Sequence, residues 1–301
     1  MALSIGTVED ATGPRDALSR ARQRAALVPD LLVDAQRIAN TVSAGWHGRR
    51  RRGSGDTFWQ FRPYDTGESL SRIDWRRSAR DDAITVRDQE WEAAHTAWVW
   101  ADNSASMLYR SQNAPVSKQA RGLVLALALA ELLARSGERV GWPGLTRPLS
   151  SRNAAERIAT ELTAATVDDG PRPQSAAIRA RSELVVVSDF LEPVADTLAW
   201  MDDTASARVR GTLIHIIDPA EHAFPFSGRT EFSDPETGAK LTFGRAETLG
   251  DDYRTAFSAR GEALAANARR LGWRYIAHRT DELASSALVA AHMQLSEGGG
   301  E

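Results

Sequence analysis

Short apolar runs recur through the C-terminal two thirds of the chain. They lack the alternation of apolar and polar residues that marks a half-exposed strand, and such runs are typical of strands buried on both faces of a parallel sheet. The predicted strands are residues 96–101 (TAWVWA), 139–142 (RVGW), 184–187 (LVVV), 212–217 (TLIHII) and 274–277 (RYIA).

Helical periodicity fills most of the stretches between these strands. The predicted helices cover residues 115–135, 153–162, 246–271 and 281–295. Gly137 follows the first of them at a position where a residue without a β-carbon suits a left-handed helix stop. Strands that alternate with helices predict an α/β fold with a doubly wound, mostly parallel sheet. Two short runs in residues 229–243 flank Asp-Pro-Glu-Thr-Gly and predict a surface hairpin before the long helix.

The N-terminal third has a different pattern. Residues 17–40 are rich in Ala, Leu, Arg and Gln at near-helical spacing and predict an amphipathic helix that covers one face of the main domain. Residues 45–55 form a loop of Gly, Arg and Ser, and residues 58–87 predict short strands and loops. We therefore expect three parts: residues 1–92 with the helix and an Arg-rich segment, residues 93–295 with the sheet, and residues 296–301 as a flexible tail.

Composition narrows the class of protein. The 301 residues include no cysteine, which excludes disulfides, thiolate zinc sites and cysteine nucleophiles. The net charge of -3 argues against a dedicated nucleic-acid binder, although residues 49–52 are four consecutive arginines. The longest apolar run, residues 123–133, is shorter than the roughly 20 residues that span a bilayer. We expect a cytoplasmic protein without a membrane span.

Acidic and hydroxyl residues follow two of the predicted strands. Asp102 begins the sequence DNSASM directly after residues 96–101, and Asp189 lies in SDF after residues 184–187. Ser104 and Ser106 share the loop of Asp102. In open α/β sheets, ligands bind at the carboxyl ends of strands, so these aspartates converge if the two strands are neighbours. Two carboxylates with two hydroxyls form an oxygen set suited to Mg²⁺ or Mn²⁺.

Other interpretations remain open from these residues alone. Asp102 can simply cap a helix or turn, since Asp and Ser are common in those roles. Alternatively, Asp102 is the phosphoryl acceptor of a Mg²⁺-dependent, phosphatase-like hydrolase. Enzymes of that kind carry a second acid two residues later, where this chain has Ser104.

Two further features have simpler explanations. The arginines at 49–52 and 72–80 fit a solvated loop and internal ion pairs better than a phosphate-binding or docking surface. His215 lies within an apolar strand and fits a satisfied core histidine better than a metal ligand.

The pattern strand, DNSASM, long helix, strand, SDF resembles the metal-ion-dependent adhesion site of von Willebrand factor A domains. Upstream, residues 58–92 (FWQFRPYDTGESLSRIDWRRSARDDAITVRDQEWE) resemble the signature block of domain-of-unknown-function family 58, whose members carry such a domain. The resemblance is clear over residues 53–189.

This resemblance implies a von Willebrand factor A-like fold and a Mg²⁺ or Mn²⁺ site formed by Asp102, Ser104, Ser106 and Asp189. It implies a non-enzymatic interaction module, an adaptor or chaperone component. The partners it implies are a MoxR-type AAA+ ATPase and other von Willebrand factor A-type proteins.

The chain departs from the family pattern in two respects. The usual threonine ligand belongs in the loop between residues 162 and 177, where Thr163, Thr166 and Ser175 are candidates but no Gly-Gly-x-Thr occurs. Many relatives also resemble membrane-anchored proteins with N-terminal spans, and this sequence contains no such span.

Overall fold

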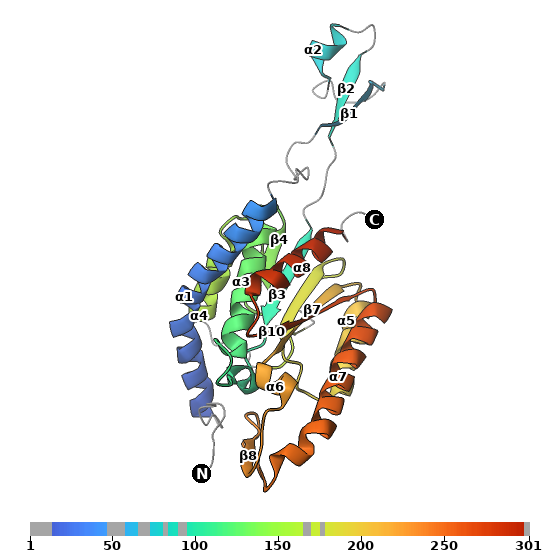
Figure 1. Cartoon of the computed structure of the whole chain (residues 1–301). Coiled ribbons are helices and arrows are strands. Elements are labelled where there is room, and N and C mark those ends of the chain that lie inside the picture. Colours follow the sequence, from blue (N-terminus) through green and yellow to red (C-terminus); the bar gives the residue numbers. More distant parts are fainter. Residues whose placement is uncertain are drawn as a thin grey trace. The chain divides into compact units, whose positions relative to one another are not determined.

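A computed structural model of the chain describes residues 14–46, 58–65, 73–80, 84–89, 95–164, 170–174 and 178–297. The chain divides into two compact units (Figure 1). Met1–Gly45 and His95–Glu301 form the sheet unit, and Trp46–Ala94 form a smaller unit. The N-terminal helix thus belongs with the sheet, whereas the sequence grouped it with the Arg-rich segment. The arginines at 49–52 and residues 298–301 of the expected tail lie outside the described residues, whereas residues 296 and 297 of that tail are helical.

A six-stranded sheet forms the centre of the sheet unit. Its order is β10-β7-β6-β3-β4-β5, and all neighbours are parallel except β4 and β5. The strands are β3 (Thr96–Ala101), β4 (Arg139–Trp142), β5 (Thr146–Leu149), β6 (Glu183–Ser188), β7 (Arg210–Ile217) and β10 (Arg274–Arg279). The central strands β3, β6 and β7 are buried almost throughout, as their apolar runs predicted. The mixed α/β class with a mostly parallel sheet is confirmed.

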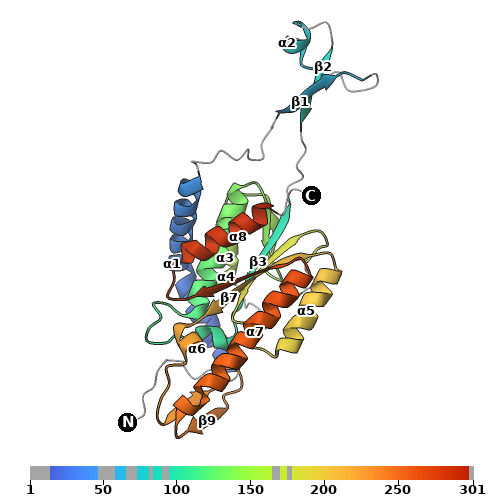
Figure 2. The same cartoon turned by 45° about the vertical axis from the view of Figure 1, so that its right-hand side comes forward.

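Helices cover the sheet (Figure 2). Helix α3 (Lys118–Arg135) packs between α4 (Ala154–Ala164) and α8 (Ala284–Glu297), whereas α5 (Val194–Ser206) packs with α7 (Gly250–Arg270). Because α3 contacts four elements of the sheet and its neighbours cover both of its sides, its residues are buried nearly throughout.

Helix α1 (Pro14–Trp46) has the amphipathic character that the sequence predicted. Its buried positions recur every three or four residues and join the core of the sheet unit: Val28, Leu31, Ala35, Ala39 and Val42. That spacing places them on one face of a helix. Arg135 Nη1 donates to Asn40 Oδ1 at 2.7 Å and ties α1 to the end of α3.

The smaller unit consists of β1 (Phe58–Pro63), α2 (Trp75–Ser78) and β2 (Thr85–Gln89). Strands β1 and β2 are antiparallel. The side chain of Asp74 accepts hydrogen bonds from the backbone N–H groups of Arg76 and Arg77 and caps α2. Ile73 and Val86 are buried. The short strands expected between residues 58 and 87 are therefore present.

Some predicted boundaries were wrong, and some elements were missed. Helix α3 begins at Lys118 and not at residue 115, because Ser117 is its N-cap and accepts from the N–H of Ala120. Residues 246–249 form a separate 3₁₀ turn before α7. The elements that the sequence did not indicate are α2, β5, α5, α6 (Pro219–Ala223) and the 3₁₀ turn η2 (Ala105–Leu108). The hairpin is confirmed as β8 (Thr230–Ser233) and β9 (Lys240–Phe243).

Within the part of the chain that the structure describes, no helix combines the length and the apolar character needed to cross a membrane.

Candidate functional site

Strands β3 and β6 are parallel neighbours at the middle of the sheet. From β3 the chain continues to β4 and β5 at one edge, and from β6 it continues to β7 and β10 at the other. The carboxyl ends of β3 and β6 therefore flank the point where the strand order reverses, which is where open α/β sheets bind ligands. Asp102 and Asp189 follow these two strands. The N–H of Asp102 donates to Val187 O at 2.8 Å, so the two strand ends remain side by side.

Asp102 is 1% exposed, and both of its carboxyl oxygens accept hydrogen bonds. Oδ1 accepts from the N–H of Ser104 at 2.8 Å, and Oδ2 accepts from Ser188 Oγ at 2.7 Å. Burial, with the nearby charge of Asp189, raises the pKa of Asp102 to about 8. Without a cation beside it, this site holds Asp102 largely in the neutral form at pH 7.

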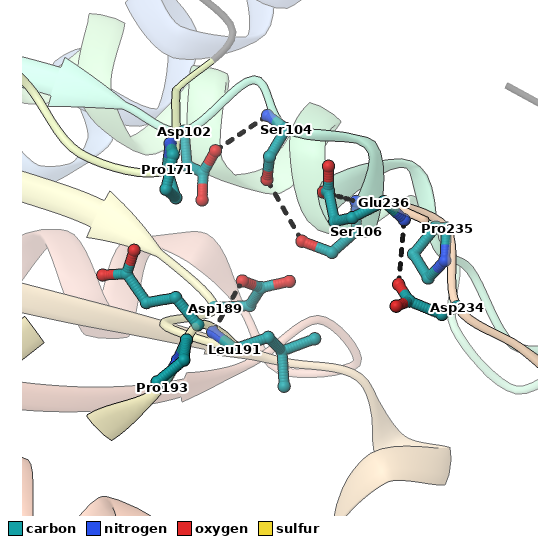
Figure 3. Close-up of a pocket in the computed structure, with 11 residues that line it drawn as sticks. Asp102, Ser104, Ser106, Pro171, Asp189, Leu191, Pro193, Asp234, Pro235 and Glu236 are labelled. Atoms are coloured by element: carbon teal, nitrogen blue, oxygen red, sulfur yellow. Dashed lines mark hydrogen bonds between the residues drawn. The ribbon is translucent and has the colours of Figure 1, made fainter. Parts of the chain in front are cut away.

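The two serines of the motif face each other. Ser104 Oγ and Ser106 Oγ lie 3.1 Å apart, and both residues are buried. The η2 turn, which starts directly after Ser104, folds the loop back so that alternate residues of the motif point to one side (Figure 3). All four predicted residues, Asp102, Ser104, Ser106 and Asp189, line one cavity, so they converge at the strand ends as predicted.

Lys118, at the start of α3, lies in the same cluster and is completely buried. Its Nζ donates to Asp189 Oδ2 at 2.7 Å and to Glu221 Oε1 at 2.5 Å. Burial alone raises the pKa of Asp189, but the Lys118 ammonium outweighs this effect and holds the pKa below its ordinary value. Burial likewise lowers the pKa of Lys118, and the charges of Asp189 and Glu221 reverse that shift. Asp189 and Lys118 are thus both ionised.

The backbone after Asp189 is strained. Phe190 has a φ of 48°, which is an outlier for a bulky side chain. Its N–H donates to Ser188 Oγ at 2.9 Å, and Arg260 Nη1 donates to its carbonyl oxygen at 2.6 Å. Such strain costs on the order of 1–3 kcal/mol and clusters at functional sites. These two hydrogen bonds fix the backbone next to Asp189 at the carboxyl end of β6.

A cavity of about 360 Å³ opens at these strand ends (Figure 3). Its walls come from the motif loop, from the loop after β6, from Pro171 and from the tip of the β8–β9 hairpin. The lining residues are Asp102, Ser104, Ser106, Pro171, Asp189, Leu191, Glu192, Pro193, Asp234, Pro235 and Glu236. The cavity is strongly acidic, because five of these residues are Asp or Glu.

The donor set fits a hard divalent cation. Asp102, Asp189 and Glu221, when ionised, leave two negative charges after Lys118 is counted. Burial and the charge of Asp189 raise the pKa of Asp102, so a cation beside Asp102 would favour its ionised form. Carboxylates and hydroxyls are the ligands that Mg²⁺ and Mn²⁺ prefer. Among the described residues, no three His, Cys, Asp or Glu side chains form a metal cluster, so the serine hydroxyls are needed to complete the set.

Of the three candidates for a further hydroxyl ligand, the structure describes Thr163, and this residue adds no ligand. Thr163 lies inside α4, where its hydroxyl donates to the carbonyl of Thr160 at 2.7 Å, and it does not line the cavity. Thr166 and Ser175 lie outside the described residues.

Sequence reasoning missed four residues of the site: Lys118, Ser188, Glu221 and Glu236. Lys118 could have been suspected from the sequence, because the helix dipole disfavours a lysine in the first turn of a long apolar helix unless acidic side chains lie near it. Glu221 could also have been suspected, since Asp218-Pro-Ala-Glu221 has the pattern of a capping box, which the structure contains. Glu236 could not be found, because its contact is 130 residues away in sequence.

His215 is a satisfied core residue, as the sequence suggested. Its Nδ1 lies 2.6 Å from the hydroxyl of Tyr275, and burial lowers the pKa of His215 to about 4.

Relatives and a solved structure resemble this chain. Uncharacterized proteins of Mycobacterium bovis and of two strains of Mycobacterium tuberculosis are each 27% identical over 252 residues, which cover 76% of this chain and 76% of theirs. The crystal structure of the conserved hypothetical protein BatB from Bacteroides thetaiotaomicron matches with a TM-score of 0.39 and 13% identity. That match covers 68% of this chain and 98% of the other. The model of the family described as protein of unknown function DUF58 matches residues 60–263, well over half of the chain. The chain belongs to the DUF58 family.

Proposed function

We propose that this chain is a protein-interaction module that binds a divalent cation, Mg²⁺ or Mn²⁺, through Asp102, Ser104, Ser106 and Asp189. One observation carries the proposal: two aspartates and two serine hydroxyls from different loops meet at the point where the strand order of the sheet reverses. A cation held by so few protein oxygens keeps open positions, and it can accept a carboxylate from a partner.

The sheet unit is, in this proposal, a von Willebrand factor A-like domain. The strand order β10-β7-β6-β3-β4-β5, with β5 antiparallel at the edge, supports that assignment. The resemblance of the motif then implies a role as adaptor or chaperone component beside a MoxR-type AAA+ ATPase and other von Willebrand factor A-type proteins.

A hydrolase that uses Asp102 as phosphoryl acceptor fits the site less well. Asp102 is 1% exposed, and both of its oxygens already accept hydrogen bonds. The position two residues later holds Ser104, which cannot act as the second acid.

A binding measurement with a purified MoxR-type ATPase from the same genome tests the proposal. We expect binding in Mg²⁺ that EDTA abolishes and that Asp102→Asn weakens at least about tenfold. The control Asp203→Asn removes an exposed carboxylate from α5 and leaves binding unchanged. Binding whose affinity is unchanged by both EDTA and Asp102→Asn contradicts the metal-dependent role. Turnover of phosphate esters that Asp102→Asn abolishes would replace it with the hydrolase.

A further inference from the structure

The tip of the β8–β9 hairpin reaches the motif loop from 130 residues away in sequence. Glu236 Oε1 accepts a hydrogen bond from the N–H of Ser106 at 2.9 Å, which places its carboxylate beside the paired serine hydroxyls (Figure 3). This contact joins the hairpin directly to the motif that binds the cation in our proposal.

The turn that carries Glu236 is well defined. Asp234 accepts from the N–H of Glu236 at 2.9 Å and from Thr237 Oγ1 at 2.5 Å. These bonds hold the pKa of Asp234 below its ordinary value. The carbonyl of Asp234 also accepts from the N–H of Gly238 at 2.8 Å. Glu236 is therefore presented by a hydrogen-bonded turn, with Pro235 restricting the backbone before it.

An aromatic contact anchors the hairpin close to its turn, while most of its strand residues are exposed. The ring of Phe232 packs against Phe224 and Phe226 with centroids 5.9 and 5.2 Å away. Most other side chains of β8 and β9 face solvent. A two-stranded hairpin has little stability of its own, so the turn that carries Glu236 depends on the Phe232 contact to stay beside the motif.

The carboxylate of Glu236 adds a negative charge to the cavity. It lines the same cavity as Asp102 and Asp189, so acidic side chains from the motif loop, the loop after β6 and the hairpin face one space. A divalent cation in that space is attracted by all three carboxylates.

We propose that Glu236 is an acidic ligand that the chain supplies to its own cation, in the place where a partner's carboxylate binds. This inference rests on the proposed function, since it requires the cation. It follows that a partner must displace the hairpin tip, and that the hairpin competes with partners of the site. Glu236 is exposed, so its departure disrupts no buried packing.

The water relaxation of bound Mn²⁺ tests the ligand role without a partner. Proton relaxivity reports how many water molecules bind the ion directly. With protein in excess, we expect Glu236→Gln to raise the relaxivity of bound Mn²⁺ by the contribution of about one water and to weaken Mn²⁺ affinity about tenfold. The control Glu231→Gln removes the same charge from β8, where Glu231 pairs with Lys240 at 3.2 Å, and leaves both quantities unchanged.

The outcomes separate the two claims. If the wild-type chain binds no Mn²⁺, both the proposed function and this inference are wrong. If the wild type binds Mn²⁺ and Glu236→Gln leaves the relaxivity unchanged, Glu236 is only a cap on η2 and the metal site stands. An equal rise in Glu231→Gln also overturns the inference, because the effect then belongs to the charge of the hairpin and not to a ligand.

Discussion

Lys118 Nζ lies 2.7 Å from Asp189 Oδ2, and the two side chains are only 0% and 3% exposed. The lysine opens α3, where the helix dipole disfavours a cation, and it has no contact with water to compensate. Asp189 and Glu221 supply that compensation. One ammonium group thus joins the N-terminus of α3, the end of β6 and the short helix α6 around the candidate site.

Removing this ammonium group leaves the carboxylates of Asp189 and Glu221 without their counter-charge. We expect Lys118→Met to lower the free energy of unfolding by about 3–5 kcal/mol, the usual cost of breaking a buried ion pair from one side. The exposed pair Lys240 and Glu231 is the matched control, and Lys240→Met costs at most about 1 kcal/mol. Urea unfolding at pH 7 in EDTA measures both. Equal losses in the two variants show that Lys118 does not stabilise the cluster.

The raised pKa of Asp102 predicts how the metal-free protein responds to pH. Its folded-state pKa of about 8 exceeds the ordinary value of 3.8, so the unfolded chain releases this proton first. Stability in EDTA therefore falls as pH rises from about 4 to about 8. Asp102→Asn is neutral at every pH and escapes this loss.

Urea unfolding in EDTA at pH 6 and pH 9 measures the difference between the two proteins. We expect Asp102→Asn to gain stability relative to the wild type at the higher pH. Ser188 Oγ, which now donates to Asp102, can accept from the new amide, so the substitution keeps the local bonds. A constant difference between the two pH values shows that Asp102 is not held neutral.

Gly211 in β7 allows Trp273 to pack against the sheet. A β-carbon at this position meets the indole ring at 2.1 Å. The ring cannot easily move, because Trp273 Nε1 donates to Val209 O at 3.1 Å and its edge contacts Trp200. We expect Gly211→Ala to cost about 3 kcal/mol, as overpacking does.

Gly244 is the control for this prediction, since a β-carbon there meets nothing within 4 Å. Gly244→Ala changes the free energy of unfolding by less than about 0.5 kcal/mol. Tryptophan fluorescence during urea unfolding follows both variants. A wild-type value for Gly211→Ala contradicts the packing described for Trp273.

The strands that the sequence located best are those buried on both faces. Strands β3 and β4 have the predicted bounds, because the run of β3 ends at Asp102 and that of β4 ends at Pro143 and Gly144. Strand β5 was missed since its sequence, TRPL, contains Arg and Pro; as an edge strand it tolerates both. Helix α5 was missed because its amphipathic pattern is interrupted by acidic residues.

Four of the eight residues that we assign to the site were predicted from the sequence. Asp102, Ser104, Ser106 and Asp189 were found because strand ends and residue spacing are local properties. Lys118 contacts Asp189 across 71 residues, and only the adjacency of α3 and β6 brings them together. The hairpin was predicted as an element, but its position over the motif depends on the packing of Phe232, which has no local signal.

The central claim is that Asp102 and its neighbours bind a divalent cation, and titration calorimetry with Mg²⁺ tests it most directly. We expect about one Mg²⁺ per wild-type chain, with Asp102→Asn weakening the affinity at least about tenfold and Asp203→Asn leaving it unchanged. Absence of binding by the wild type, or equal affinity in Asp102→Asn, contradicts the account.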